Sequence, residues 1–173
     1  YQLGAMYAFT KKHGGEIQHF KPHGNLYIMT YTKAMSGDAS WAEAIGRAVQ
    51  KFDKSLVVMG MAGAPTQDIW RNMGLKVASE VYPDRENNAN MTHVSRRVPG
   101  AVILDHNRVL ERAVMMAKEH KVIAMDGTVL ENVEFESMCV HGDNPETLQG
   151  LRDINKAFKD NGIEVTPVAN IAK

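Results

Sequence analysis

The densest group of side chains that could do chemistry lies near the start of the chain. Lys21, His23 and Tyr27 follow a strand-like run and precede a helix-like run. Ligands of α/β proteins bind at the carboxyl ends of strands, and Pro22 and Gly24 predict a tight turn that would hold these polar groups in place. A polar surface loop with one exposed histidine fits the same spacing equally well.

Two later loops carry similar groups. Asp84, Arg85 and Arg96 follow one predicted strand, and His141 and Asp143 follow another. If the strands are parallel, these loops gather on the same face as the first. A histidine exchanges protons near neutral pH, and an arginine can bind a carboxylate through two parallel hydrogen bonds. The pattern therefore favours acid–base catalysis on an anionic substrate.

Structural roles remain open for two of these groups. Asp143 is equally well placed to cap the helix that follows it. Asp84 and Arg85 could form a surface ion pair, which contributes under about 1 kcal/mol.

Other site classes lack their motifs. No histidine or cysteine pair has the spacing of a zinc site, and the loop at 60–65 lacks the Lys-Ser/Thr of a phosphate-binding loop. Gly-x-Ser-x-Gly, the elbow of serine hydrolases, is also absent. Cys139 lies in an apolar run and is interpreted as a core residue.

The totals describe an ordinary globular protein. The 173 residues suffice for a single domain spanning 1–173, and the formal net charge of zero gives no reason to expect nucleic acid as a partner. The sequence contains no run of about 18 apolar residues, so it predicts no membrane-spanning helix. A single cysteine excludes an internal disulfide and indicates a cytoplasmic location.

Strands and helices alternate along the chain. The pattern predicts helices at 2–13, 25–35, 40–53, 66–73, 105–120 and 145–161, strands at 16–21, 56–59, 75–81, 135–140 and 163–168, and a hairpin within 122–133. Alternation implies a mostly parallel sheet or barrel. Five such strands are too few to close a barrel of seven or eight, so we expect an N-terminal portion to be missing.

Details of one helix can also be predicted. Ser40 and Glu43 have the spacing of a capping box at the start of the 40–53 helix. That helix is expected to bury Trp41, Val49 and Phe52, together with Ile45.

Four segments together resemble the LamB/YcsF family, the A subunit of bacterial-type 5-oxoprolinase. Residues 2–6 (QLGAM) resemble the family's helix before the central strand. Residues 21–27 (KPHGNLY) resemble the family signature KPHGALY, and residues 139–145 (CVHGDNP) resemble CVHGDTP. Between them, Asp84, Arg85, Arg96 and the segment 99–103 follow the family order of an Asp-Arg pair, an arginine and PGAVI. The resemblance covers essentially the whole chain.

The chain departs from the family at two places. Asn87 and Met91 stand in the long loop where the family usually has Tyr and Gly. Family members also extend further at the N-terminus, so the chain resembles a C-terminal portion.

The resemblance implies both a fold and an activity. The fold would be a seven-stranded (β/α) barrel of the glycoside hydrolase/deacetylase type, incomplete because N-terminal strands are absent. The activity would be ATP-dependent opening of the 5-oxo-L-proline lactam to L-glutamate, performed with two other subunits. ATP would be a co-substrate, a divalent metal is possible, and homo-oligomerisation is left open.

Site roles follow from placing the loops within these motifs. His23 and His141 are predicted to exchange protons, and Lys21 to stabilise negative charge on the lactam oxygen. Arg85 or Arg96 would bind the substrate carboxylate or a phosphate. The remaining members of the predicted site are Asp84 and Asp143, which would orient these groups, and Tyr27, which would contact substrate.

Two other functions stay open. One is a metal-dependent amide hydrolase or deacetylase on the same barrel. The other is a non-catalytic subunit that delivers a small acid to partner chains.

Overall fold

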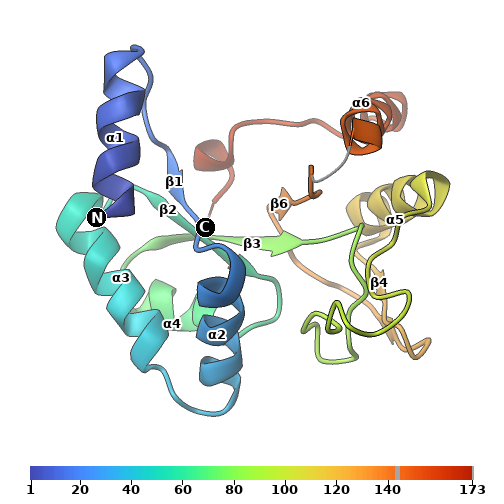
Figure 1. The fold of residues 1–173 in the computed structure, drawn as a ribbon, viewed down its shortest axis with the longest axis horizontal. Coiled ribbons are helices and arrows are strands. Elements are labelled where there is room, and N and C mark those ends of the chain that lie inside the picture. The colour runs from blue at the N-terminus through green and yellow to red at the C-terminus, as the bar shows by residue number, and fades with distance from the viewer. Residues whose placement is uncertain (143–144, 173) are drawn as a thin grey trace. The chain divides into compact units, whose positions relative to one another are not determined.

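The computed structural model in Figure 1 describes residues 1–142 and 145–172, and only the backbone of 145–148. The chain divides into two compact units, and the division falls within one strand. The first unit is Tyr1–Ser79 with Pro167–Lys173, and the second is Glu80–Thr166. Each unit has its own hydrophobic core.

Helices and strands alternate as predicted. The first unit contains α1 (Gln2–Lys12), β1 (His19–Phe20), α2 (Gly24–Met35), α3 (Ser40–Asp53), β2 (Val57–Met61), α4 (Thr66–Asn72), the start of β3 (Lys76–Val81) and the 3-10 helix η1 (Val168–Asn170). The second contains the end of β3, α5 (His106–Glu119), β4 (Val122–Ile123), β5 (Val129–Leu130), β6 (Ser137–Met138) and α6 (Pro145–Asp160).

The main sheet has the strand order β1-β2-β3-β6. β1 pairs with β2 in parallel, with His19 opposite Val57. The end of β3 pairs with β6 in parallel, with Glu80 opposite Ser137. The fold is therefore mixed α/β with parallel pairing, as the alternation of elements predicted.

The core of the first unit is built on β2. Every residue of Val57–Met61 is buried, which is typical of a parallel strand covered on both faces. In Figure 1 helices α2, α3 and α4 lie on the same side of this strand. Trp70 of α4 is the largest fully buried side chain here, and its indole N–H donates to the carbonyl of Ala42 at 2.8 Å.

The core of the second unit lies between α5 and α6, which pack side by side. Ile103, Val109, Ala113, Ile154 and Phe158 form this core. The predicted hairpin is confirmed: β4 and β5 are antiparallel, and the turn places Gly127 at φ +88°, which favours glycine.

The long polar segment that follows β3 folds back on itself. The amide of Glu86 donates to the carbonyl of Ala101 at 2.9 Å, and the amide of Ile103 donates to that of Asp84 at 2.9 Å. These bonds satisfy backbone groups that burial of the segment removes from water.

Several sequence predictions need correction. The strands predicted at 16–21 and 135–140 are each reduced to two residues, β1 and β6. The strand predicted at 163–168 is wrong: the amide of Ile163 instead donates to the carbonyl of Phe158 and ends α6, and η1 begins at Val168.

The capping box is also wrong. The N-cap of α3 is Ala39, without a side-chain cap, and the amide of Ser40 binds the Oδ1 of Asp38 at 3.0 Å. Of the side chains expected to be buried in α3, Val49 is buried, but Trp41 is 39% and Phe52 40% exposed. Helical periodicity finds the inner face of a helix but not its exposed edges.

Candidate functional site

Asp84 and His141 form the centre of the candidate site. They are brought together although 57 positions separate them in the chain. The Oδ2 of Asp84 accepts a hydrogen bond from the backbone amide of His141 at 2.8 Å, and it lies 2.8 Å from the Nδ1 of the same residue. A single carboxylate oxygen therefore fixes both the backbone and the ring of His141. This arrangement assigns the proton of the neutral imidazole to Nδ1 and leaves Nε2 free for proton exchange.

The two side chains differ in exposure. The side chain of Asp84 is 11% exposed, whereas that of His141 is 31% exposed and can reach a ligand. Burial alone raises the pKa of Asp84, but the hydrogen bonds from the His141 side chain and backbone and the attraction of the imidazole together hold it below its ordinary value. Asp84 is therefore ionised at neutral pH and can stabilise a protonated His141.

The second oxygen of Asp84 has a different environment. Its Oδ1 is buried and accepts no hydrogen bond from the part of the chain that the structure describes. Buried acceptors without donors are rare in folded proteins. This oxygen is therefore an unsatisfied acceptor among the described residues.

Arg112 of α5 holds the backbone around Asp84. Its guanidinium donates to the carbonyls of Pro83 at 3.0 Å and Arg85 at 3.1 Å, the residues on either side of Asp84. It also donates to the carbonyl of Ile123 at 3.3 Å. The carboxylate of Glu86, which is itself buried, lies 3.5 Å from the same guanidinium and also pairs with Arg108.

The other predicted residues of this unit are placed differently. Arg85 is buried, and its Nη2 donates to the carbonyl of Val94 at 3.0 Å, so part of its guanidinium serves the loop. Arg96 is exposed. Asp143 lies outside the described residues. Substrate binding by these residues stays a prediction.

Lys21, His23 and Tyr27 belong to the first unit. His23 is the exposed N-cap of α2, with extended backbone, and Gly24 follows it at φ +58°, a conformation that favours glycine. The ammonium of Lys21 lies 6.0 Å from the ring centroid of Tyr27. Tyr27 is buried, and the narrow gap that it lines with Thr30 and Trp70 has no room for a water molecule. The prediction that these residues share a face with His141 stays a prediction.

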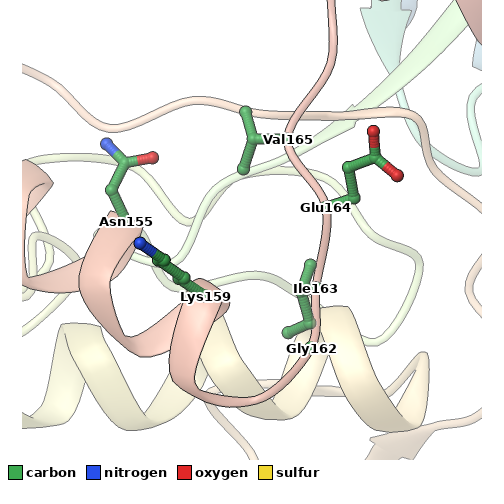
Figure 2. Close-up of a pocket in the computed structure, with 6 residues that line it drawn as sticks. All are labelled: Asn155, Lys159, Gly162, Ile163, Glu164 and Val165. Atoms are coloured by element: carbon green, nitrogen blue, oxygen red, sulfur yellow. The ribbon is translucent and has the colours of Figure 1, made fainter.

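A larger cavity contains none of the predicted residues. It has a volume of about 400 Å³ and lies at the end of α6. Figure 2 shows Asn155 and Lys159 on the helix opposite Val165, with the carboxylate of Glu164 pointing away. We assign no chemistry to this cavity.

Two features are absent from the residues that the structure describes. They hold no group of three or more His, Cys, Asp or Glu side chains placed to bind a metal ion. Among the same residues, no helix combines the length and the apolar character needed to cross a bilayer.

Sequence reasoning missed the residues that support His141. Tyr82 stacks against its ring, Glu80 binds Tyr82, and Arg112 holds the loop. Tyr82 and Glu80 flank a buried strand end and resemble core residues. The position of Arg112 on the buried face of α5 was a usable signal, because a charged residue there needs a specific partner.

The whole chain matches one family. The model of the LamB/YcsF family matches residues 1–173. The chain is 39% identical over 173 residues to the 5-oxoprolinase A subunit of Pyrococcus furiosus, covering 100% of this chain and 66% of that protein. It is 40% identical over 168 residues to the protein of the same name from Pyrococcus abyssi, covering 97% and 64%.

A solved structure has the same fold. The crystal structure of a lactam utilization protein from Thermus thermophilus is 33% identical, with a TM-score of 0.83. The match covers 95% of this chain and 63% of that chain. The chain thus spans somewhat less than two thirds of the length of the relatives that it matches.

Proposed function

Because the chain belongs to the LamB/YcsF family, we propose that it acts in a 5-oxoprolinase, opening the lactam of 5-oxo-L-proline to L-glutamate with hydrolysis of ATP. The observation that carries this proposal is identity near 40% along the whole chain to proteins named as the A subunit of 5-oxoprolinase. We further propose that the parallel sheet is part of a (β/α) barrel of the seven-stranded type. The likeness to a longer lactam utilization protein supports this fold.

The chemistry explains the need for ATP. A lactam is a resonance-stabilised amide, and its carbonyl carbon is a poor electrophile. Transfer of a phosphoryl group from ATP to the carbonyl oxygen would make this carbon easier for water to attack. Departure of the ring nitrogen would then leave γ-glutamyl phosphate, which a second water would hydrolyse to glutamate and phosphate. The sequence contains no GxxxxGK[ST] motif of a P-loop, so we assign ATP binding to none of its residues.

Asp84 and His141 suit the proton transfers of ring opening. The Nδ1 of His141 is held by Asp84, so its Nε2 can accept a proton from the attacking water and return it to the departing ring nitrogen. The ionised Asp84 stabilises the imidazolium that forms in between.

The remaining roles concern charge. In this proposal His23 is a second proton donor or acceptor and Lys21 stabilises the developing charge on the lactam oxygen. Arg85 or Arg96 binds the carboxylate of 5-oxoproline, with Tyr27 and Asp143 completing the site.

ATP-dependent release of glutamate by the complex assembled with its two partner subunits tests the proposal. His141→Gln is expected to lower kcat by about 10²- to 10⁴-fold, the range of general acid–base catalysis. His23→Ala should also lower it. His106→Gln is the matched control, because His106 pairs with Asp153 on the surface of the same unit, and it should retain activity within about twofold.

The same preparation separates the alternatives. Wild-type turnover in both His141→Gln and His23→Ala would remove these residues from the mechanism. Amide hydrolysis that needs no ATP and stops after chelation would favour a metal-dependent hydrolase. Tight binding of intact 5-oxoproline in calorimetry, with turnover indifferent to both variants, would favour a delivery role.

A further inference from the structure

A second group of residues surrounds the imidazole of His141. The ring of Tyr82 stacks against it, with centroids 6.1 Å apart and planes 26° apart. The ring of His93 meets Tyr82 nearly perpendicularly, with centroids 4.4 Å apart. Tyr82 is only 4% exposed, so its ring lies between two histidines away from solvent.

The hydroxyl of Tyr82 is anchored at the opposite end. It donates to the Oε2 of Glu80 at 2.6 Å, and Glu80 is 3% exposed. The hydroxyl of Ser137 donates to the Oε1 of the same carboxylate at 3.1 Å. Since Glu80 and Ser137 are register partners of β3 and β6, the anchor is fixed to the sheet.

We propose that Tyr82 is a positioning residue for His141, its ring fixing the plane of the imidazole while Asp84 fixes its Nδ1. The effect of Tyr82 on the orientation of His141 does not depend on which reaction the protein performs. Its effect on turnover rests on the proposed function.

Asp84 alone does not determine the orientation of the imidazole. A hydrogen bond at Nδ1 restrains one atom and still allows the ring to tilt about it. The ring of Tyr82, offset beside one face of the imidazole, limits that tilt on its side. Rotation of Tyr82 away from His141 would break its hydrogen bond to the buried Glu80. Leaving a buried carboxylate with one donor fewer costs free energy, so this rotation is disfavoured.

The attraction between the two rings is a smaller effect. A centroid distance of 6.1 Å is at the outer limit of cation–π contacts, which extend to about 6 Å. We therefore expect Tyr82 to act mainly through geometry. Misplacement of a catalytic group lowers the rate of the chemical step more than it lowers substrate binding.

NMR of histidine-labelled chain tests the structural part without turnover. The ring resonances of His141 are identified by their loss in His141→Gln. In the wild type they should show the upfield shift of a proton over an aromatic face, and the ¹⁵N shifts of a neutral Nδ1–H tautomer. Tyr82→Leu should abolish the upfield shift and leave the tautomer, which Asp84 sets, unchanged. Phe158→Leu, another aromatic-to-leucine change, in the core between α5 and α6, is the control and should leave both signals intact.

Tyr82→Phe keeps the ring and removes the hydroxyl that binds Glu80. This variant replaces Tyr82→Leu in the test if the leucine variant does not fold. It should weaken the upfield shift. Unchanged His141 resonances in folded Tyr82→Leu, or in Tyr82→Phe where leucine does not fold, would overturn the proposal.

Turnover supplies the second readout. In the assembled complex, Tyr82→Leu should lower kcat by about 10-fold or more while KM stays within about twofold, and Phe158→Leu should change neither. A change in KM alone would overturn a positioning role. If the wild-type complex opens no lactam, the proposed function fails, whereas the NMR comparison still decides the role of Tyr82.

Discussion

Replacing Arg112 with methionine should destabilise the second unit strongly. Methionine keeps much of the apolar stem of Arg112 and removes every donor. The change frees the carbonyls of Pro83, Arg85 and Ile123 and takes one cation from the buried carboxylate of Glu86.

The expected cost is about 3–5 kcal/mol, the range for removing one partner of a buried ion pair. Three bonds from a charged donor at about 1.5–3 kcal/mol each would sum to more. Two features reduce that sum. Arg108 still pairs with Glu86, and Ile123 is 39% exposed, so water can reach its carbonyl. The cost is nevertheless large against the roughly 5–15 kcal/mol by which whole domains are stable.

Urea unfolding followed by two signals measures the effect. Trp41 and Trp70 are the only tryptophans of the chain, and both belong to the first unit. Tryptophan fluorescence therefore reports the first unit, while far-UV circular dichroism reports the helices of both. Arg112→Met should lower the urea concentration at the unfolding midpoint in both signals. The decrease measured by circular dichroism should equal or exceed the decrease measured by fluorescence.

The control is Arg71→Met in α4. Arg71 pairs with Asp68 in an exposed bridge, which contributes at most about 1 kcal/mol. A loss below about 1 kcal/mol in Arg112→Met, at an unchanged m-value, would show that the loop needs no clamp. Glu86→Gln combined with Arg112→Met should recover part of the loss, since it removes the charge left with one partner.

Three further predictions concern acid stability, helix capping and core packing. The pKa of Asp84 is lowered in the folded chain. The ionised carboxylate therefore stabilises the fold fully above its unfolded pKa of about 4, and this stabilisation is lost as the pH falls through the folded pKa. Between pH 6 and 3 the melting temperature should therefore fall less steeply in Asp84→Asn than in the wild type. Asp105→Ala should lower the free energy of unfolding in urea by about 1 kcal/mol, because Asp105 caps α5 through the amide of Arg108. Ser40→Ala should change it by less than about 0.5 kcal/mol. A larger loss in Ser40→Ala than in Asp105→Ala would contradict the cap assignments. Gly60→Ala should lower the free energy of unfolding by about 1–3 kcal/mol, since its Cβ would lie 2.7 Å from Cζ3 of Trp70. Gly46→Ala should cost less, because the closest neighbour of its Cβ is the movable end of Met73. Equal costs would refute the packing argument.

Local patterns predicted the elements well where apolar periodicity was strong. The helices at 40–53, 66–73 and 145–161 end within one or two residues of α3, α4 and α6. Strand lengths were overestimated at 16–21 and 135–140, because apolar alternation continues beyond the residues that find a pairing partner. The predicted strand at 163–168 failed for a similar reason: Ile163 packs against the core of the second unit instead of pairing.

The candidate site was predictable only in part. The motifs around Asp84 and His141 identified two residues that do meet, and parallel strands explain why their loops converge. Nothing local indicated that Tyr82 would stack on His141, since that contact depends on where the chain returns after β6. The role of Arg112 likewise depends on three carbonyls that lie 11 to 29 positions from it.

The separation of 57 positions between Asp84 and His141 has a kinetic consequence. Closing so long a loop is entropically costly and slow compared with forming a helix. During synthesis Asp84 emerges well before His141, so the growing chain cannot form this pair until the later segment is made. The pairing of Asp84 with His141 therefore forms late, when β6 docks beside β3, and any event that delays this docking delays the pairing without altering either side chain.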